Sequence, residues 1–269
     1  MSTKPVFLEA RDLGDAWFLA LDEVMMRGRR YLITKGSYEG QYRSGKPITI
    51  LINHPGTKPL FPIMPEGSNI PPPTTEEDIN EYMEYLMTNR RRPNEHYTYG
   101  EDLSWLIEWV IKHYQKYGHG TNHCYMTVGR PETVFFYDRD ANYQENVWAT
   151  YELVDGGLRS WQTIVQREIS NRWNRDQQIE TSSQCLRGID TWVDEGQLNF
   201  WCYFRSWDLW GGFPVNLGGI QLVKEYMASS IGVKDGYMMV SCKDLHIYEH
   251  AWVVALMRLN KSEEEGGAK

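Results

Sequence analysis

The chain has 269 residues, a formal net charge of −8 and 41% hydrophobic residues. This length suffices for one large domain or two small ones, and the acidic balance argues against a broad surface for nucleic acid. No apolar run approaches the ~18 residues of a membrane-spanning helix. The four cysteines lack C-x-x-C spacing, which gives no sign of a zinc site. We therefore expect a cytoplasmic protein with reduced thiols, without a metal or membrane contact.

Hydrophobic periodicity and turn residues divide the first half of the chain into alternating helices and strands. Thr75 marks one helix start most clearly, because it is a hydroxyl cap followed by three acidic residues in the first turn. The predicted elements, in chain order, are a helix over 11–28, two strands within 30–53, a proline-rich extended connection over 54–73, helices over 75–89 and about 101–117, and a strand within 122–137.

The second half begins with a polar, charged stretch over residues 138–180, which holds a helical pattern around 158–173. Too few apolar residues are present there to close a core, so we interpret it as an insertion in one domain that spans residues 1–269. The predicted elements that follow are a hairpin over 189–205, whose stretch 198–204 reads as buried on both faces, a helix over 214–231, a strand over 236–241, a helix over 246–259 and a disordered tail over 260–269.

Four short motifs follow one another in the C-terminal third. They are Gln184-Cys185-Leu186, then Tyr203-Phe204-Arg205-Ser206-Trp207-Asp208, then Gly212-Phe213-Pro214-Val215-Asn216, and Asp244-Leu245-His246-Ile247-Tyr248. A thiol, a guanidinium, an amide and a His-x-Tyr pair suit a phosphorylated pyrimidine. The thiol can attack the ring, the guanidinium can hold phosphate in a bidentate fork, and the amide can read the edge of the base.

These motifs, in this order and at this spacing, resemble the thymidylate synthase superfamily. Their amino-acid sequences look most like those of its compact archaeal-type branch. The match covers roughly residues 185–250. The resemblance implies an α/β fold with a large, mixed, twisted β-sheet, helices packed on one face, and a homodimer that pairs two such sheets. It also implies dUMP as substrate and 5,10-methylenetetrahydrofolate as co-substrate, with no metal.

The resemblance implies that Cys185 is the catalytic nucleophile. Addition of its thiolate to carbon 6 of uracil would turn the ring into an enolate, whose carbon 5 can attack an electrophilic one-carbon unit. A nearby Arg205 would favour the thiolate. The catalytic glutamate of the family corresponds to Glu81, with Glu84 one helical turn away as the alternative. Tyr99 resembles the tyrosine that orders water beside the leaving proton.

The resemblance carries substrate contacts to five positions, which are Arg205 and Ser206 for the phosphate, Asn216 for the pyrimidine edge, and His246 and Tyr248 for the sugar 3′-hydroxyl. Arg43, just after the glycine-rich loop, is a candidate phosphate ligand from the same chain. Asn216 favours dUMP over dCMP, because relatives that act on cytosine tend to carry aspartate there. Family members also take two phosphate-binding arginines from the partner subunit, at a place that reads Asn122-His123 here.

Two positions would contact the folate. Asp208 resembles the aspartate that touches the pterin ring, and Gly212 would let the backbone approach that ring closely. Each proposed site residue has a simpler alternative that the sequence leaves open. A free cysteine is often a small buried hydrophobe, an aspartate can form a turn, an asparagine can cap a helix, a histidine can lie in the core, and a helix-face glutamate is often solvated.

The product depends on the fate of the carbon-5 methylene group. Hydride from tetrahydrofolate would give a methyl group, and water would give a hydroxymethyl group. In long-form relatives a C-terminal segment closes over the folate, and here 21 residues follow Tyr248. We expect a thymidylate synthase that forms dTMP. The alternatives are a pyrimidine nucleotide hydroxymethyltransferase acting on dUMP, dCMP or CMP, and a non-catalytic nucleotide-binding homologue.

Overall fold

The computed structural model describes residues 4–34, 38–68, 70–91, 97–129, 151–154, 157–160 and 184–262. The chain divides into two compact units, the first formed by residues 1–129 with 184–269 and the second by residues 130–183. The described part of the second unit is an antiparallel hairpin of β5 (Tyr151–Val154) and β6 (Gly157–Ser160). The helical pattern predicted around 158–173 is therefore wrong where it overlaps β6. Otherwise the predicted insertion and most of the predicted tail fall outside the described residues.

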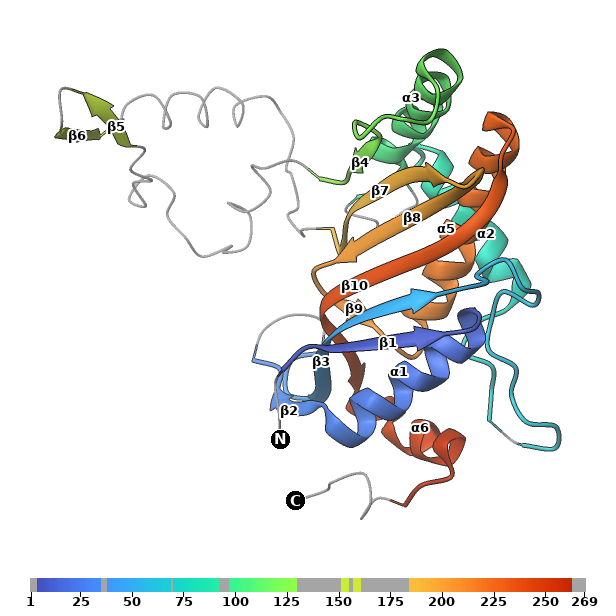
Figure 1. Cartoon of the computed structure of the whole chain (residues 1–269). Coiled ribbons are helices and arrows are strands. Elements are labelled where there is room, and N and C mark those ends of the chain that lie inside the picture. The colour runs from blue at the N-terminus through green and yellow to red at the C-terminus, as the bar shows by residue number, and fades with distance from the viewer. Residues whose placement is uncertain are drawn as a thin grey trace. The chain divides into compact units, whose positions relative to one another are not determined.

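An eight-stranded mixed sheet organises the first unit (Figure 1). Its central order is β1-β3-β10-β8-β7-β4, with β2 beside β3 and β9 beside β10. β1 runs parallel to β3, and β8 and β9 run parallel to β10, while the other pairs are antiparallel. The strands are β1 (Val6–Ala10), β2 (Arg29–Leu32), β3 (Tyr42–Ile52), β4 (Tyr125–Thr127), β7 (Leu186–Asp194), β8 (Gln197–Phe204), β9 (Trp207–Asp208) and β10 (Lys234–Tyr248).

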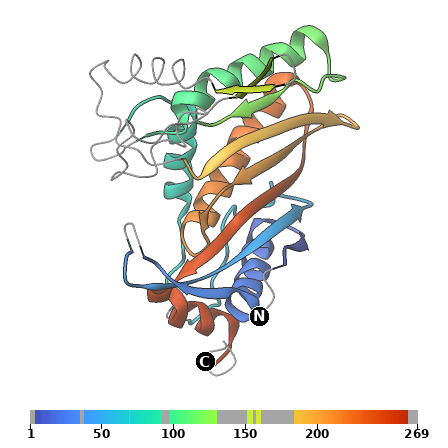
Figure 2. The ribbon, with the colours of Figure 1, turned by 90° about the vertical axis from the view of Figure 1, so that its left-hand side faces the viewer.

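The helices of the first unit lie on one face of this sheet, as the resemblance predicted (Figure 1). The strands fan out with a pronounced twist in Figure 2. The helices are α1 (Leu13–Arg27), α2 (Glu76–Met87), α3 (Gly100–Tyr117), α5 (Gly212–Ile231) and α6 (Trp252–Leu259), with a 3₁₀ turn over Glu249–Ala251. Among the described residues, none of the helices combines the length and apolar character needed to cross a bilayer. The mixed α/β fold with a large mixed sheet is thus confirmed.

Local signals fixed several element ends. The predicted cap at Thr75 is present as a full capping box. The Thr75 hydroxyl accepts a hydrogen bond from the Asp78 N–H, and the Asp78 carboxylate accepts one from the Thr75 N–H. The turn of the predicted hairpin lies at Glu195 and Gly196, which have φ values of 47° and 72°. Positive φ at both residues matches the twist of the two flanking strands.

The prediction for the C-terminal segment is wrong in one respect. Residues 246–248 belong to β10, and α6 begins only at Trp252. The segment Leu245–Tyr248 pairs with β3 on one side, and its first two residues pair with β9 on the other, after an irregularity that follows Cys242. This pairing to distant strands outweighs the local helical pattern. Strand β1 was not among the predicted elements.

Helices α2 and α5 touch at the level of the backbone. A Cβ atom on Gly219 would lie 2.7 Å from Tyr82 Cδ1 and 3.1 Å from the Met83 nitrogen, and one on Gly218 would lie 2.6 Å from Ile79 Cδ1. Two consecutive residues without a side chain therefore allow α2 to lie directly on α5. This contact fixes the position of α2, which forms one wall of the pocket described below.

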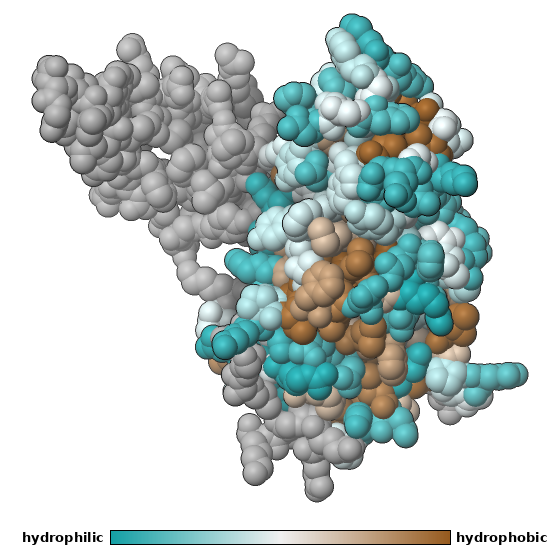
Figure 3. All heavy atoms as spheres, in the orientation of Figure 1, coloured by the Kyte–Doolittle hydropathy of each residue, from teal (hydrophilic) through white to brown (hydrophobic). Residues whose placement is uncertain are grey.

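The other face of the sheet exposes aromatic side chains. Trp201 and Tyr203 of β8 are 44% and 42% exposed, although their neighbours Phe200, Cys202 and Phe204 are buried. In the single chain the stretch 198–204 is therefore buried on one face only, and burial of its second face stays a prediction that depends on the pairing of two sheets. Phe7 of β1 and Tyr125 of β4 are also exposed. In Figure 3 a brown, apolar patch lies near the middle of this side, among pale and teal side chains.

Candidate active site

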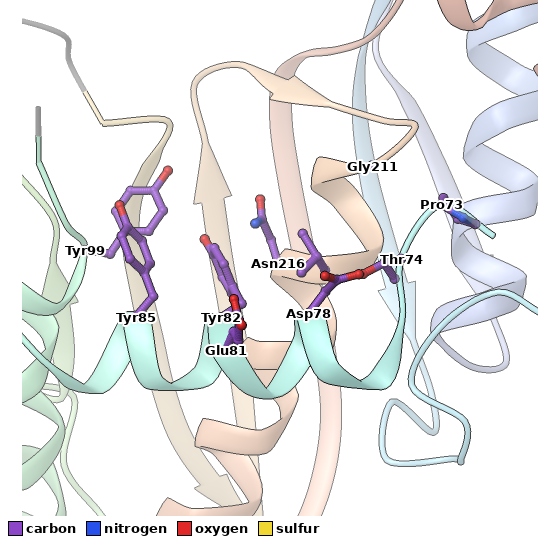
Figure 4. Close-up of a pocket in the computed structure, with 10 residues that line it drawn as sticks. Pro73, Thr74, Asp78, Glu81, Tyr82, Tyr85, Tyr99, Gly211 and Asn216 are labelled. Carbon is purple, nitrogen blue, oxygen red and sulfur yellow. The ribbon is translucent and has the colours of Figure 1, made fainter. Parts of the chain in front are cut away.

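A cavity of about 490 Å³ lies between α2 and the start of α5 (Figure 4). Its volume falls within the range of small-molecule sites. The lining residues are Pro73, Thr74, Asp78, Glu81, Tyr82, Tyr85, Tyr99, Gly211, Val215 and Asn216. Three of the predicted site residues, Glu81, Tyr99 and Asn216, are brought together here from separate elements.

One face of α2 supplies the polar wall of the cavity. Asp78, Glu81, Tyr82 and Tyr85 recur at the spacing of one helical face and point into the cavity. Glu84 is also exposed on α2, but it is not among the lining residues. The geometry therefore favours Glu81 over Glu84 as the carboxylate that a ligand would meet.

The predicted nucleophile and its arginine are in contact. Cys185 and Arg205 lie at the paired ends of β7 and β8, where the Arg205 N–H donates to the Cys185 carbonyl at 2.9 Å. Arg205 Nη2 lies 4.0 Å from the Cys185 sulfur, and Arg205 Nε donates to the Gln184 carbonyl at 3.2 Å. The half-buried Ser206 follows directly. A thiol and a guanidinium twenty residues apart in sequence thus share one corner of the sheet.

Tyrosines connect this corner to the cavity. The Tyr99 hydroxyl accepts the Leu186 N–H at 3.2 Å, next to Cys185 in the chain. Burial raises the pKa of both Tyr82 and Tyr99 well above the ordinary value, and neighbouring tyrosines and a negative charge on Cys185 would raise it further. Both phenols therefore stay protonated at neutral pH. Tyr82 was not predicted, because nothing in its local sequence separates it from the core aromatics.

The amide of Asn216 is held by an indole. Its Oδ1 accepts a hydrogen bond from Trp207 Nε1 at 2.8 Å. Asn216 lies in the second turn of α5, so it does not cap that helix. The carboxylate of Asp208 accepts the N–H groups of Gly211 and Gly212 at 3.1 and 3.0 Å instead. Asp208 therefore orders the turn into α5, and Gly212 lies at the start of that helix, beside the lining residue Gly211.

His246 and Tyr248 point to the same side of β10, with ring centroids 4.9 Å apart. The His246 Nδ1 lies 2.9 Å from the Asp244 carbonyl, which can only accept, so Nδ1 carries the proton. Nε2 is then an acceptor, and it is buried without a partner among the described residues. Burial lowers the pKa of His246, which favours the neutral ring. Such a nitrogen suits a hydroxyl donor.

Arg43 lies opposite Tyr248 in the register of β3 and β10. Its Nη2 forms an ion pair with Asp244 Oδ2 at 3.0 Å, and its guanidinium stacks on Tyr31. The Tyr31 hydroxyl donates to the same carboxylate. Asp244 thus competes with any phosphate for Arg43, a competition that sequence reasoning missed. Asn122 and His123 are exposed just before β4.

Comparisons with known proteins bear on this arrangement. A family model described as thymidylate synthase matches residues 158–266. A protein of Methanosarcina acetivorans named "Putative thymidylate synthase" is 23% identical over 253 residues, which cover 91% of this chain and 90% of the relative. The resemblance to the thymidylate synthase superfamily is confirmed. A protein of the same name from Methanothermobacter marburgensis is 32% identical over 77 residues, 28% of this chain and 34% of the relative. Both relatives support the archaeal-type placement.

The thymidylate synthase family consists of one-carbon transferases of nucleotide biosynthesis that use methylenetetrahydrofolate as co-substrate. The resemblance suggests the same class of enzyme for this chain. The M. acetivorans relative also spans the N-terminal half, which holds Glu81, Tyr99 and Arg43. Among the described residues no group of three or more His, Cys, Asp or Glu side chains is arranged to hold a metal ion.

Thiol reactivity gives a first check on the site. All four cysteines are described, and only Cys185 is not buried. Burial raises the pKa of Cys124 and Cys242 and raises that of Cys202 to about 12. We expect iodoacetamide at neutral pH to alkylate Cys185 well before the others, as read by peptide mass spectrometry, and dUMP to slow the reaction. Equal labelling of a buried cysteine would contradict this geometry.

His246 should also shape the dependence of stability on pH. Its pKa is lowered in the folded chain, so the unfolded chain binds the proton first as the pH falls. At pH values below about 6.5 the free energy of unfolding should then decrease, by up to about 1.4 kcal/mol per pH unit. In thermal melts the His246→Asn variant should lose less stability on acidification than the parent. The control variant is His54→Asn, at an exposed histidine outside β10.

Proposed function

We propose that this protein transfers a one-carbon unit from 5,10-methylenetetrahydrofolate to carbon 5 of dUMP and forms dTMP. The observation that carries the proposal is the contact between the half-buried Cys185 thiol and Arg205, beside tyrosines that line a cavity holding Glu81 and Asn216. Neither a core cysteine nor a surface arginine requires such surroundings. The resemblance to thymidylate synthases supports the same assignment.

The chemistry begins with the Cys185 thiolate, which adds to carbon 6 of the uracil ring. The electron pair moves to carbon 5 and oxygen 4, and carbon 5 forms a bond to the one-carbon unit. The proton on carbon 5 must then leave. The carboxylate of Glu81 lines the cavity and can accept it through an ordered water, while the protonated Tyr99 can hold that water. As the carbon-5 proton leaves, the bond between the one-carbon unit and the folate nitrogen would break, which releases tetrahydrofolate and leaves a methylene group on carbon 5. Hydride from tetrahydrofolate would reduce this methylene to the methyl group and form dihydrofolate, while the thiolate leaves carbon 6 and frees Cys185.

The remaining residues would bind the nucleotide by its parts. Arg205 and Ser206 would hold the phosphate, with Arg43 joining only if it exchanges its Asp244 partner. The bare Nε2 of His246 would accept the sugar 3′-hydroxyl, with Tyr248 at its side. Asn216 would meet the edge of the base. Asp208 and Gly212, at the turn into α5, would lie on the folate side of the nucleotide.

We also propose that two copies pair through the exposed face of the sheet. Phe7, Tyr125, Trp201 and Tyr203 are 42–59% exposed there, and apolar surface of this kind marks an interaction site. Sedimentation velocity should show a dimer, and Trp201→Lys should shift it toward the monomer. A parent that stays monomeric at all accessible concentrations would contradict this pairing.

One observation favours a hydroxymethyl product as the second candidate. Tyr82 lines the cavity, and within the part of the chain that the structure describes its hydroxyl is buried without a hydrogen-bond partner. A small rotation of Tyr82 toward the cavity would let this hydroxyl hold a water molecule beside Glu81, which could add to the carbon-5 methylene group before hydride does. The same ligands would then yield 5-hydroxymethyl-dUMP and tetrahydrofolate.

The deciding experiment is the mass of the nucleotide formed from dUMP and methylenetetrahydrofolate, with dCMP and CMP in parallel. A methyl increment with release of dihydrofolate is expected. A hydroxymethyl increment without dihydrofolate would replace the proposal by the second candidate. Failure to form product from any of the three nucleotides, with binding retained, would identify a nucleotide-binding homologue instead.

A further inference from the structure

We infer that Trp207 is a positioning residue that fixes the amide of Asn216 and thereby sets the preference of the cavity for uracil over cytosine. The inference deepens the proposed function and rests on it, because it concerns how a pyrimidine nucleotide would be read. It starts from one contact, the hydrogen bond of 2.8 Å between Trp207 Nε1 and Asn216 Oδ1.

The indole of Trp207 is held on all sides. It is 3% exposed and stacks on Phe204 at a centroid distance of 3.8 Å with an interplanar angle of 3°. Phe213 packs against it at 4.5 Å. Its backbone pairs with Leu245 of β10 through the short strand β9. An indole so enclosed keeps its N–H pointing in one direction, so it acts as a fixed donor.

This donor decides which way the amide of Asn216 is turned. An indole N–H can only donate, so the atom 2.8 Å away must be the amide oxygen and not the amide nitrogen. In Figure 4 Asn216 reaches into the cavity, with its nitrogen turned toward the side of Tyr82. The amide therefore presents an N–H₂ donor to the cavity, while one lone pair of its oxygen is already used.

The fixed amide distinguishes the two bases. Uracil has an acceptor at position 4 and a donor at N3, and cytosine has the reverse pair. A freely rotating amide could match either base by turning half a revolution. In this chain the rotation would bring the amide nitrogen against the indole N–H, so that two donors would face each other. Binding of cytosine by the rotated amide would therefore forfeit the hydrogen bond to Trp207, whereas binding of uracil would keep it.

The test compares the affinities of dUMP and dCMP by calorimetry in the parent and in Trp207→Phe, which keeps a ring for the stack but removes the N–H. The ratio of the two affinities should fall about two- to tenfold, the range for one neutral hydrogen bond. Trp17→Phe is the matched control. It removes another buried indole bond, of 2.9 Å to the Leu209 carbonyl, and should lower stability without changing the ratio.

The same Trp207→Phe change in an Asn216→Asp variant separates the loss of amide positioning from a general loss of nucleotide binding. In Asn216→Asp both side-chain atoms are acceptors, so rotation changes nothing, and adding Trp207→Phe should leave the ratio of affinities unchanged. An equal fall in both backgrounds, or no fall in either, would overturn the inference. A parent that binds neither nucleotide would instead overturn the proposed function on which the inference rests, so the two failures are distinguishable.

A measurement on the parent avoids dependence on a stable variant. The Trp207 indole proton, followed by NMR during exchange with deuterium, should stay protected when dUMP is bound and exchange faster when dCMP is bound. Equal protection with both nucleotides would contradict a role for this hydrogen bond in base preference.

Discussion

The Cys185→Ser variant is expected to form product from dUMP at least about a thousandfold more slowly than the parent, while it binds dUMP with similar affinity. A hydroxyl has nearly the volume of a thiol, so the corner between β7 and β8 keeps its shape. An alcohol is a far weaker nucleophile than a thiolate toward carbon 6, and the covalent route is then closed. Initial rates and calorimetric titrations with dUMP measure the two quantities separately.

The control for this variant is the same substitution at Cys242. That thiol is buried, and its pKa is raised mainly by burial. Cys242→Ser should therefore lose some stability but retain turnover per folded molecule. Turnover preserved in Cys185→Ser would show that the thiol is not the nucleophile, and loss of dUMP affinity in that variant would show that Cys185 acts in binding instead.

Replacement of both Gly218 and Gly219 by alanine is expected to destabilise the chain by about 2–6 kcal/mol, since forcing extra methyl groups into a packed contact costs about 1–3 kcal/mol each. Glycine-to-alanine changes inside a helix ordinarily stabilise by roughly 0.5–1 kcal/mol. The expected change in stability has the opposite sign here, because a Cβ on Gly219 would lie 3.1 Å from the backbone nitrogen of Met83. A backbone atom cannot rotate away from this contact as a side chain could.

Urea unfolding measures this effect, and Ser229→Ala is its control, because Ser229 is an exposed position in the same helix. That change should stay within about 0.5 kcal/mol. The alanine pair should also raise the Michaelis constant for dUMP, since displacement of α2 moves Glu81 and Tyr82 away from Asn216. A double variant as stable as the parent would mean that α2 is not held against the α5 backbone.

Features encoded by neighbouring residues were predictable from the sequence. The capping box at Thr75 and the turn at Glu195-Gly196 each depend on a few consecutive side chains, and the structure places both where the sequence indicated. The motif around Cys185 and Arg205 was equally informative, because two strands joined by a tight turn bring positions twenty residues apart to the same level.

Features that depend on distant partners were not predictable. His246 was assigned to the start of a helix by its local pattern, and only pairing with β3 and β9 makes it part of a strand. The ion pair of Arg43 with Asp244 joins residues 201 positions apart, and the residues around each of them do not predict it. The hydrophobicity of β8 predicted a cover on both faces, but it does not say whether the covering surface comes from the same chain or from a second copy.

The sheet also has a consequence for the order in which the site is assembled. Cys185 and Arg205 lie at the ends of a hairpin closed by a two-residue turn, so they can meet through local contacts alone. His246 joins them only after α5 has crossed over and β10 has paired in parallel with β8. Local pairings form faster than pairings across a long crossover. During refolding, we therefore expect the thiol and its guanidinium to come together before the proposed nucleotide site is complete, and recovery of dUMP affinity to lag behind formation of the hairpin.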